Sequence, residues 1–292
     1  MELLANALVR GILVGSAYAL IAVGFVLIYK ATQVLNFAQG YMTMVGGFIC
    51  YTFTIQLGLP LPLGIAISLA VGYGMGVLIE RGIMHHLIGQ PLLSLVVVTL
   101  FIGTLLDAIR LIVWGGLNKN LSFMPLSMTE IGPLMISNSL LICFVVVLFC
   151  ISILLVLFKK TKLGLAMRAV SEDQQLSLIF GVKVKSIYTI VWGISGVLAV
   201  AGATALGGIA PIGTPLLGFG MIALVVVLLG GLESFVGAIV GGLIVGVVYE
   251  LTASYIDPLI IGASGVAPYI VLLIILIIKP SGLFGLKKIE RI

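Results

Sequence analysis

The chain contains 292 residues, of which 61% are hydrophobic and only 9% are charged, and its mean hydropathy is +1.34. A soluble domain carries about 25% charged residues, so this composition excludes a water-soluble protein and predicts an integral membrane protein. The net charge of +5 does not indicate nucleic acid binding, because most basic residues lie in two short segments beside apolar runs.

Nine apolar runs approach the length of about 20 residues that a helix needs to cross a bilayer. They are residues 11–29, 37–55, 63–79, 92–114, 134–158, 188–206, 217–232, 235–256 and 266–278. The seventh and ninth runs are short, so we expect eight to ten spans, some of them short or broken. The first run is too long for a signal-peptide core and has no basic leader, so we expect it to be a retained helix. The predicted fold class is an all-α, polytopic transmembrane helical bundle in which residues 1–292 form a single domain.

Two stretches are expected to interrupt regular helix. Residues 34–47 (VLNFAQGYMTMVGG) place Asn36, Gln39 and Gly40 at the start of an apolar segment, and residues 207–220 (GGIAPIGTPLLGFG) are rich in proline and glycine. A membrane tolerates broken backbone only inside protein or beside a water-filled path. The two stretches are weakly similar, and paired interrupted segments in two halves of a chain are typical of the path in repeat-built transporters. The alternative is a polar helix start in which Asn36 satisfies its own backbone.

Residues 159–187 form the longest polar interval and hold six of the fifteen basic residues. Ser171 and Gln174 have the spacing of a capping box, in which each side chain satisfies a free N–H group of the other. Glu172 and Asp173 would then lie in the first turn, where the helix dipole favours acidic residues. This pattern predicts the start of a helix within a polar, cytoplasmic loop.

The same segment carries an apolar stripe and a termination signal. Leu176, Ile179 and Phe180 fall at positions i, i+3 and i+4, on one face of a helix that is otherwise polar. Gly181 is the residue type expected just past a helix end. We therefore predict an amphipathic helix over residues 171–180, whose stripe either docks on a partner or lipid surface or folds back on the bundle.

The basic residues orient the predicted spans, because lysine and arginine accumulate on the cytoplasmic side. With residues 159–187 inside, nine crossings place the N-terminus outside the cell and the C-terminal tail inside. Twelve of the fifteen basic residues then lie on the inner side. The pattern predicts a multi-pass plasma membrane protein with a cytoplasmic C-terminus.

The groupings that carry catalysis or nucleotide binding are missing from the sequence. It contains no G-x-x-x-x-G-K-[ST] motif, no HExxH motif and no Ser/His/Asp or Cys/His grouping. Asp107 and Arg110, at i and i+3, could neutralise one another, and an interface position is the simplest explanation for Glu250. Adjacent His85 and His86 face different ways on a helix and predict no metal site. We expect no enzyme activity, metal or cofactor in this chain, and a transport path whose energy comes from elsewhere.

The chain resembles the permease subunits of ABC importers for branched-chain amino acids, specifically the LivH-like subunit. The resemblance covers nearly the whole chain. It rests on residues 15–20 with the apolar run that follows, NFAQG at 36–40, GLAMRAVSEDQQLSLIFG at 164–181, LGGLESFVGAIVGG at 229–242 and PSGLFG at 280–285. The family commonly has histidine where this chain has Gln39, and its substrates are diverse.

This resemblance implies four kinds of partner in a prokaryotic inner membrane: a second, LivM-like permease subunit, two cytoplasmic ABC ATPase subunits that bind ATP and Mg, an extracytoplasmic substrate-binding protein, and membrane lipid. It implies no nucleic acid. It also implies that the helix at residues 171–180 docks in a groove of the ATPase. The implied coupling residues are Arg168, Glu172, Asp173, Leu176, Ile179, Phe180 and Gly181. The implied path-lining residues are Asn36, Phe37, Gln39 and Gly40.

Two alternatives stay open. The same architecture could import urea or short amides, because the family is broad. An ATP-independent secondary transporter or channel would instead give flux through this chain alone and would depend on Glu250 or Asp107.

Overall fold

The computed structural model describes residues 2–87, 89–121, 123, 127–131 and 134–285. Its α-helices are α1 (Glu2–Thr32), α2 (Gln39–Tyr51), α3 (Leu61–Gly82), α4 (Leu92–Trp114), α5 (Asn138–Lys160), α6 (Lys162–Glu172), α7 (Gln174–Ile179), α8 (Val184–Leu206), α9 (Thr214–Gly230), α10 (Phe235–Tyr255) and α11 (Ala263–Ile278). A π-helical turn follows α2 at Thr52–Gln56, and a 3-10 turn follows α3 at Met84–Leu87. The strands β1 (Met128–Ile131) and β2 (Leu134–Ser137) form one hairpin.

The prediction of an all-α polytopic bundle is confirmed, and each of the nine apolar runs forms a helix. Six helices in the described part of the chain are long and apolar enough to cross a membrane, namely α1, α3, α4, α5, α8 and α10. The seventh and ninth runs form the shorter apolar helices α9 and α11, as expected from their length. The second run is shorter than predicted, because its first two residues belong to a turn and α2 itself has only 13 residues.

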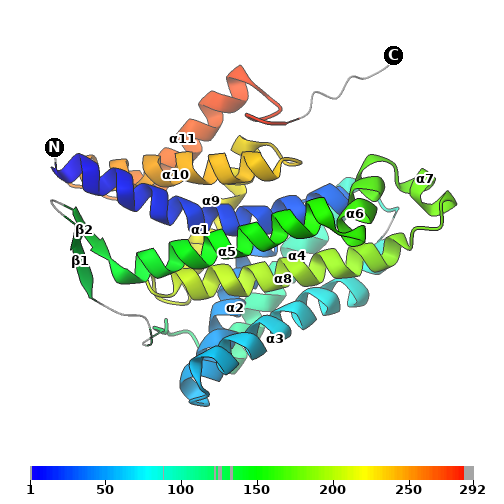
Figure 1. The fold of residues 1–292 in the computed structure, drawn as a ribbon, viewed down its shortest axis with the longest axis horizontal. Coiled ribbons are helices and arrows are strands. Elements are labelled where there is room, and N and C mark those ends of the chain that lie inside the picture. Colours follow the sequence, from blue (N-terminus) through cyan, green and yellow to red (C-terminus); the bar gives the residue numbers. More distant parts are fainter. Residues whose placement is uncertain (1, 88, 122, 124–126, 132–133, 286–292) are drawn as a thin grey trace.

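The long helices lie side by side, with the N-terminus and the hairpin at one end of the bundle and α6 and α7 at the opposite end (Figure 1). Helices α1 and α8 form the centre: 94% and 83% of their most apolar windows are buried. The corresponding fractions for α3, α4 and α5 are 28%, 22% and 28%, so these helices form the outside. The apolar outer faces are suited to lipid or to further membrane subunits.

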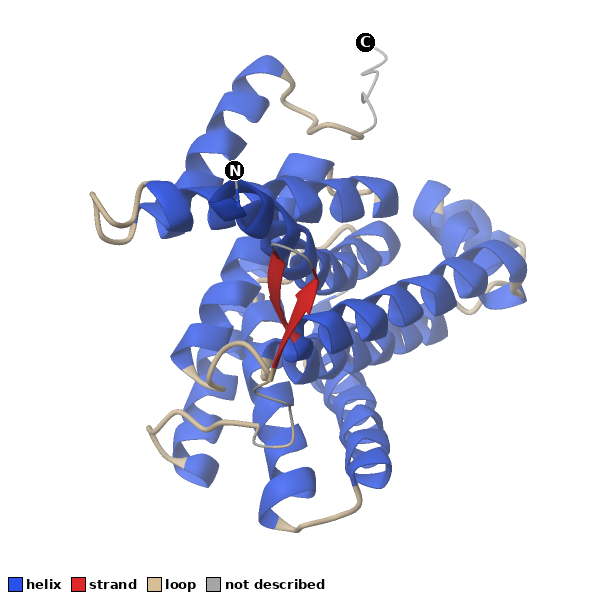
Figure 2. Cartoon of the chain, turned by 60° about the vertical axis from the view of Figure 1, so that its left-hand side comes forward, coloured by secondary structure: helices blue, strands red, loops and turns tan. Residues whose placement is uncertain are grey.

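The hairpin changes the predicted start of the fifth span. Figure 2, in which this end of the bundle comes forward, shows the two strands in red in front of the helices. They pair antiparallel, with Met128 opposite Ser137 and Thr129 opposite Ile136. The run predicted at 134–158 therefore begins as strand β2, and α5 starts only at Asn138. The apolar pattern of this run continued from strand into helix, so it did not mark the boundary.

Two helix pairs pack backbone to backbone through glycine. In the α1–α10 pair, a Cβ atom on Gly11 would lie 2.6 Å from Val247 Cα, and one on Gly15 would lie 2.6 Å from Gly242 O. In the α3–α8 pair, Cβ atoms on Gly76 and Gly196 would overlap backbone atoms of the facing helix. Both pairs are antiparallel, and small residues at four-residue spacing are what permits such close approach in a membrane.

One helix of each glycine-lined pair carries the same short pattern of residues. Helix α3 carries Gly72, Gly76 and Glu80, and α10 carries Gly242, Gly246 and Glu250 at the same spacing. The two helices run in opposite directions, and both glutamates are buried, with exposed fractions of 1% and 8%. The two helices therefore carry the same glycine and glutamate spacing in opposite orientations, as expected of equivalent helices in an inverted repeat.

Candidate functional site

A tight turn separates α1 from α2 and directs the chain back into the bundle. Gln33 has a φ of +55°, an uncommon value for a residue other than glycine. The side-chain oxygen Oδ1 of Asn36 accepts a hydrogen bond from the N–H group of Ala38 at 3.1 Å, which forms an Asx turn. The residue at the N-cap of α2 is Ala38, without a side-chain cap. Asn36 thus shapes the turn before α2 instead of capping the helix.

Three buried polar side chains meet at the centre of the bundle. Asn36 Nδ2 donates to Gln39 Oε1 at 3.2 Å, and Ser195 Oγ donates to the same oxygen at 2.8 Å. Gln39 Nε2 donates to the carbonyl of Ser195 at 3.4 Å. Ser195 Oγ also lies 3.2 Å from the carbonyl oxygen of Gly24 in α1. This polar network joins α1, α2 and α8, and Asn36, Gln39 and Ser195 have no exposed surface (0%).

A glycine makes room for the network. A Cβ atom on Gly24 would lie 2.7 Å from Gln39 Nε2, so a larger residue there would displace the amide. Ser195 and Gly24 were not predicted from sequence, because each lies in an apolar helix with no local polar pattern. Buried polar groups are costly unless they are paired, and here each finds a partner. The network therefore fixes the relative positions of the three helices in this conformation.

The other two predicted path residues face different elements. The N–H group of Phe37 donates to Thr99 Oγ1 of α4 at 3.3 Å, and the Phe37 side chain is half-buried. Gly40 lies against α9, where a Cβ atom on Gly220 would overlap the Gly40 backbone. The structure thus brings Asn36 and Gln39 together and places Phe37 and Gly40 at the contacts of the same turn with α4 and α9.

A helix that was not predicted, α6, follows the C-terminal end of α5 and leads to α7. Thr161 accepts a hydrogen bond from Gly164 N at 3.1 Å and so caps the start of α6. Arg168 donates from Nη1 to the carbonyl oxygen of Phe158 at 2.5 Å. That carbonyl belongs to the last turn of α5, where a cation is favourable. Arg168, one of the predicted coupling residues, therefore holds α6 against the end of α5.

The prediction of one helix over residues 171–180, capped by Ser171, is wrong. Ser171 and Glu172 form the end of α6, and α7 spans Gln174–Ile179. Asp173 is extended (φ −151°, ψ 111°) and its side chain accepts from Leu176 N at 2.9 Å. Asp173 is thus the cap of α7. Ser171 is unable to cap a new helix because the helix started at Thr161 already includes it.

The predicted end of α7 is confirmed. Gly181 has a φ of +79°, and its N–H group donates to Leu178 O while Val182 N donates to Ser177 O at 2.9 Å. These two bonds form a Schellman motif, which requires a left-handed residue such as glycine. The short helix is therefore closed at both ends by hydrogen bonds.

The apolar side chains of α7 do not fold back on the bundle. Leu176, Ile179 and Phe180 are 52%, 78% and 82% exposed. Glu172 and Asp173 beside them are also exposed. An exposed apolar patch on an ordered, polar segment is typical of a docking surface.

A polar cavity of about 320 Å³ lies between this segment and the ends of the central helices. Its lining includes Lys30 at the end of α1, Gln174 of α7, Tyr188 of α8 and Glu233 between α9 and α10. The α6–α7 segment thus faces the ends of several helices that form the bundle, including the two that carry Gly24 and Ser195.

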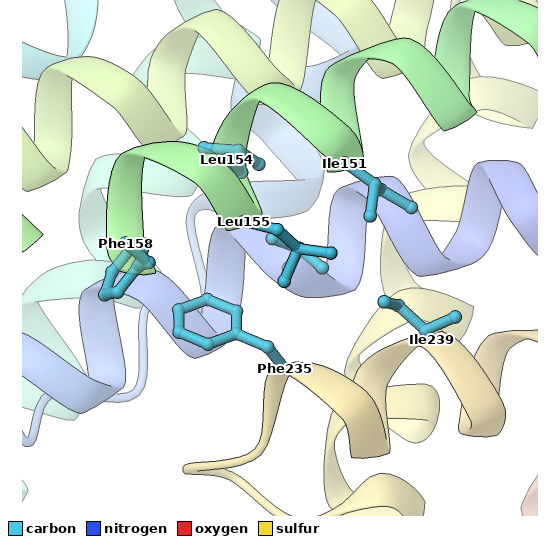
Figure 3. Close-up of a pocket in the computed structure, with 7 residues that line it drawn as sticks. Ile151, Leu154, Leu155, Phe158, Phe235 and Ile239 are labelled. Carbon is cyan, nitrogen blue, oxygen red and sulfur yellow. The ribbon is translucent and has the colours of Figure 1, made fainter. Parts of the chain in front are cut away.

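An apolar groove between α5 and α10 cannot bind a polar substrate. Figure 3 shows Ile151, Leu154, Leu155 and Phe158 of α5 facing Phe235 and Ile239 of α10. The rings of Phe158 and Phe235 are 4.5 Å apart. The groove has a volume of about 10 Å³, the lower limit for one water molecule. It is a packing gap and not a binding pocket.

Several ionisable residues of the helices have polar partners. The predicted pair is confirmed, since Arg110 Nη2 lies 2.7 Å from Asp107 Oδ1. Glu250 lies 3.7 Å from Arg10 Nε at the N-terminal end of the bundle. Glu80 was not predicted to take part in any contact, and it accepts a hydrogen bond from Thr189 Oγ1 at 2.6 Å. In the part of the chain that the structure describes, no group of three His, Cys, Asp or Glu residues could hold a metal ion.

A helical bundle with apolar outer faces, a polar network at its centre and a polar segment at one end defines a multi-pass membrane protein. Comparison with known proteins identifies its class further. Residues 7–279 match the family described as branched-chain amino acid transport system / permease component. The chain belongs to this family and is a permease component of a transporter.

Individual relatives match over almost their full length. The permease protein BraD of the high-affinity branched-chain amino acid transport system of Pseudomonas aeruginosa is 29% identical, with 98% of this chain and 97% of BraD covered. A probable branched-chain amino acid transport permease protein LivH of Methanocaldococcus jannaschii is 31% identical, with 96% and 93% covered. LivH of Escherichia coli is 23% identical, with 97% and 96% covered. No solved structure matches the chain significantly.

Proposed function

We propose that this chain is a permease subunit of an ATP-driven importer in a prokaryotic plasma membrane. With a second permease it would form the path for branched-chain amino acids that an extracytoplasmic binding protein delivers. The names of its relatives support this substrate class. The missing nucleotide-binding motif supports separate ATPase subunits as the source of energy.

The observation that carries the proposal is the exposed apolar face of α7. Ile179 and Phe180 are 78% and 82% exposed on a helix whose ends are both fixed by hydrogen bonds. Burying a side chain of this size contributes about 1.5–3 kcal/mol. Two such residues in a groove of an ATPase would supply a stable grip, and Glu172 and Asp173 would add polar contacts at its edge.

Movement of α7 has a physical route to the centre of the bundle. Arg168 links α6 to the last turn of α5, and the polar cavity places Gln174 beside the ends of α1 and α8. Displacing α7 would therefore shift α1 and α8, which carry Gly24 and Ser195 of the polar network. In our proposal, separation of α2 from α8 opens the path, and Asn36, Phe37, Gln39 and Gly40 line it in that state.

The test is substrate-stimulated ATP hydrolysis and uptake by the complete transporter in proteoliposomes. We expect Phe180→Asp to lower both activities by tenfold or more, because it places a charge in the docking face. Leu117→Asp is the matched control, since Leu117 is 75% exposed in the loop that follows α4, at the opposite end of the bundle. Wild-type coupling in Phe180→Asp would remove α7 from the mechanism. Full uptake by the chain alone would instead favour an ATP-independent transporter.

The substrate is tested by competition in the same vesicles. Leucine, isoleucine and valine should compete with one another for uptake, whereas urea and short amides should not. Inhibition by the amides and not by the amino acids would favour the other substrate class.

A further inference from the structure

A basic cavity lies at the end of α3 that is nearest to α6 and α7. Its volume is about 340 Å³, and its lining consists of polar side chains from α3, the following 3-10 turn and the start of α8. These side chains are Arg81, His85, His86, Lys185, Ser186 and Thr189. Neither the transport path nor the docking face of α7 includes any of them.

The two strongest cations of the cavity have no partner within the described chain. The described ion pairs are Arg10–Glu250, His85–Glu80 and Arg110–Asp107. None of them includes Arg81 or Lys185, and both residues are exposed and line the cavity. Two unpaired cations facing one cavity repel each other, so the cavity is suited to an anion.

The buried carboxylate of Glu80 bonds to two residues of the cavity lining and holds its walls together. Glu80 is only 1% exposed. Its Oε2 accepts from Thr189 Oγ1 of α8 at 2.6 Å, and its Oε1 lies 3.3 Å from His85 Nδ1. Both oxygens therefore have a partner, and no ion pair among the described residues joins Glu80 to Arg81. The bond to Thr189 joins α3 to α8, so the two walls that carry Arg81 and Lys185 keep a fixed separation.

The donors in the cavity fit a phosphate group. An arginine fork gives bidentate hydrogen bonds to phosphate oxygens, and a lysine adds a point charge. The hydroxyl of Ser186 is a further donor at the start of α8. Helix α8 has no side-chain cap at this end, so the positive end of its dipole also favours an anion here.

The position of the cavity favours a lipid as the source of that phosphate. Helix α3 lies at the edge of the bundle beside α8 (Figure 1). Its outer face carries exposed apolar residues, with Val71 at 39% and Leu78 at 73%, and leads directly to Arg81 one turn later. A helix of 22 residues is about 33 Å long, close to the hydrocarbon thickness of about 30 Å. Arg81 therefore lies at the level of the headgroups, and the exposed apolar face of α3 next to it is available to acyl chains.

We propose that this cavity binds the headgroup of an anionic phospholipid that has no ammonium group, such as phosphatidylglycerol. The choice of leaflet rests on the orientation in the proposed function, which puts the cavity on the cytoplasmic side. A lipid with an ammonium group is disfavoured because Arg81 and Lys185 would repel it. Basic pockets between membrane helices on this side bind anionic headgroups in other membrane proteins.

The test measures lipid that stays bound to the purified full-length chain after detergent washing, from membranes with equal phosphatidylglycerol and phosphatidylethanolamine. We expect the wild type to retain phosphatidylglycerol in preference. Arg81→Gln with Lys185→Gln should lower its apparent affinity about thirtyfold, or roughly five- to sixfold per charge removed. Lys159→Gln with Lys160→Gln is the matched control, because these exposed lysines at the end of α5 do not line the cavity. Arg81→Lys with Lys185→Arg should restore retention, which excludes misfolding as the cause.

A second arm separates lipid from soluble phosphate. Inorganic phosphate at 10 mM should not displace the bound phosphatidylglycerol. Displacement, equal retention of both lipids, or unchanged retention in Arg81→Gln with Lys185→Gln would overturn the proposal. Loss of a protein subunit from the complete transporter in that variant, with lipid retention unchanged, would assign the cavity to a protein partner. The assay uses the chain alone, so its failure leaves the coupling role of α7 untouched.

Discussion

Replacing Gln39 with leucine tests the polar network most sharply, because the change keeps a side chain of roughly similar size and removes all of the side-chain hydrogen bonds of residue 39. Two buried donors, Asn36 Nδ2 and Ser195 Oγ, then lose their shared acceptor. Each keeps a weaker alternative, namely Met42 Sδ at 3.6 Å and Gly24 O at 3.2 Å. We therefore expect Gln39→Leu to lower the free energy of unfolding by about 1–2 kcal/mol, the lower part of the range for unsatisfied buried groups.

The role in transport needs a readout that stability alone does not move. Ser195→Ala should cost about 1 kcal/mol by itself and should couple to Gln39→Leu by about 0.5–1 kcal/mol in a double-mutant cycle. The cycle is measured by reversible unfolding in mixed micelles, and uptake is measured on the same variants in proteoliposomes. Thr252→Val is the matched control, since the Thr252 hydroxyl bonds only to Val248 O of its own helix, at 2.8 Å.

If the network regulates opening of the path, Gln39→Leu and Asn36→Ala will change uptake by fivefold or more while assembly and Thr252→Val uptake stay normal. Normal uptake in both network variants, together with a coupling energy of zero, would refute this reasoning. The network would then be a structural contact between α1, α2 and α8.

Three further predictions concern local structure. Asp173→Ala should unfold α7 locally, with a loss of about 1 kcal/mol, and should increase hydrogen exchange at 174–182, whereas Glu172→Ala should not. Gly76→Val should prevent α3 from packing on α8, because its side chain would overlap the backbone of Trp192, and should abolish recovery of the folded chain; Gly74→Val, with nothing within 4 Å, should be tolerated. Hydrogen bonds from the side chain and N–H group of Ser264 lower the pKa of Asp257. Protection of the first turn of α11 against hydrogen exchange should therefore be complete above the ordinary aspartate pKa of about 3.9. It should be lost only as the pH falls through the lowered pKa of Asp257. Asp257→Asn should remove that pH dependence, and a transition at or above the ordinary pKa in the unaltered chain would contradict it.

Most of the architecture could be predicted from the sequence because hydropathy alone marks membrane helices. The nine runs, the short seventh and ninth helices and the Asp107–Arg110 pair all follow from local patterns. The start of α5 could not be predicted in this way, since the apolar run continues through strand β2 into the helix. Strand β2 is distinguished from α5 by its pairing with strand β1, which is a separate segment of the chain.

The coupling segment shows where local rules compete. Ser171 and Asp173 are both good N-caps, and the sequence pattern around Ser171 fits a capping box. Residues earlier in the chain determine which of the two caps a helix. Thr161 starts α6 and Arg168 holds α6 to α5, so Ser171 already belongs to α6. The glycine terminator needed no such context, since only a left-handed residue completes the Schellman motif at Gly181.

The centre of the site could be predicted only in part. Asn36 and Gln39 were identified because polar residues at a broken apolar segment are unusual. Their partner Ser195 lies 156 residues from Gln39, and Gly24 lies in a different helix, α1. Single small residues in apolar runs carry no local signal. Glu80, Arg81 and Lys185 likewise meet only through the packing of α3 on α8.

The central claim is that α7 faces the cytosol and is held there by an ATPase. The variant Ile179→Cys adds one exposed cysteine, whose labelling by a membrane-impermeant maleimide reports the side of the membrane on which α7 lies. The native cysteines interfere little, because Cys50 and Cys143 are buried and Cys150 is half-buried. We expect labelling in inside-out but not right-side-out vesicles, and strong protection when the ATPase subunits are bound. Labelling from the outer surface, or labelling that the ATPase subunits do not reduce, would contradict it.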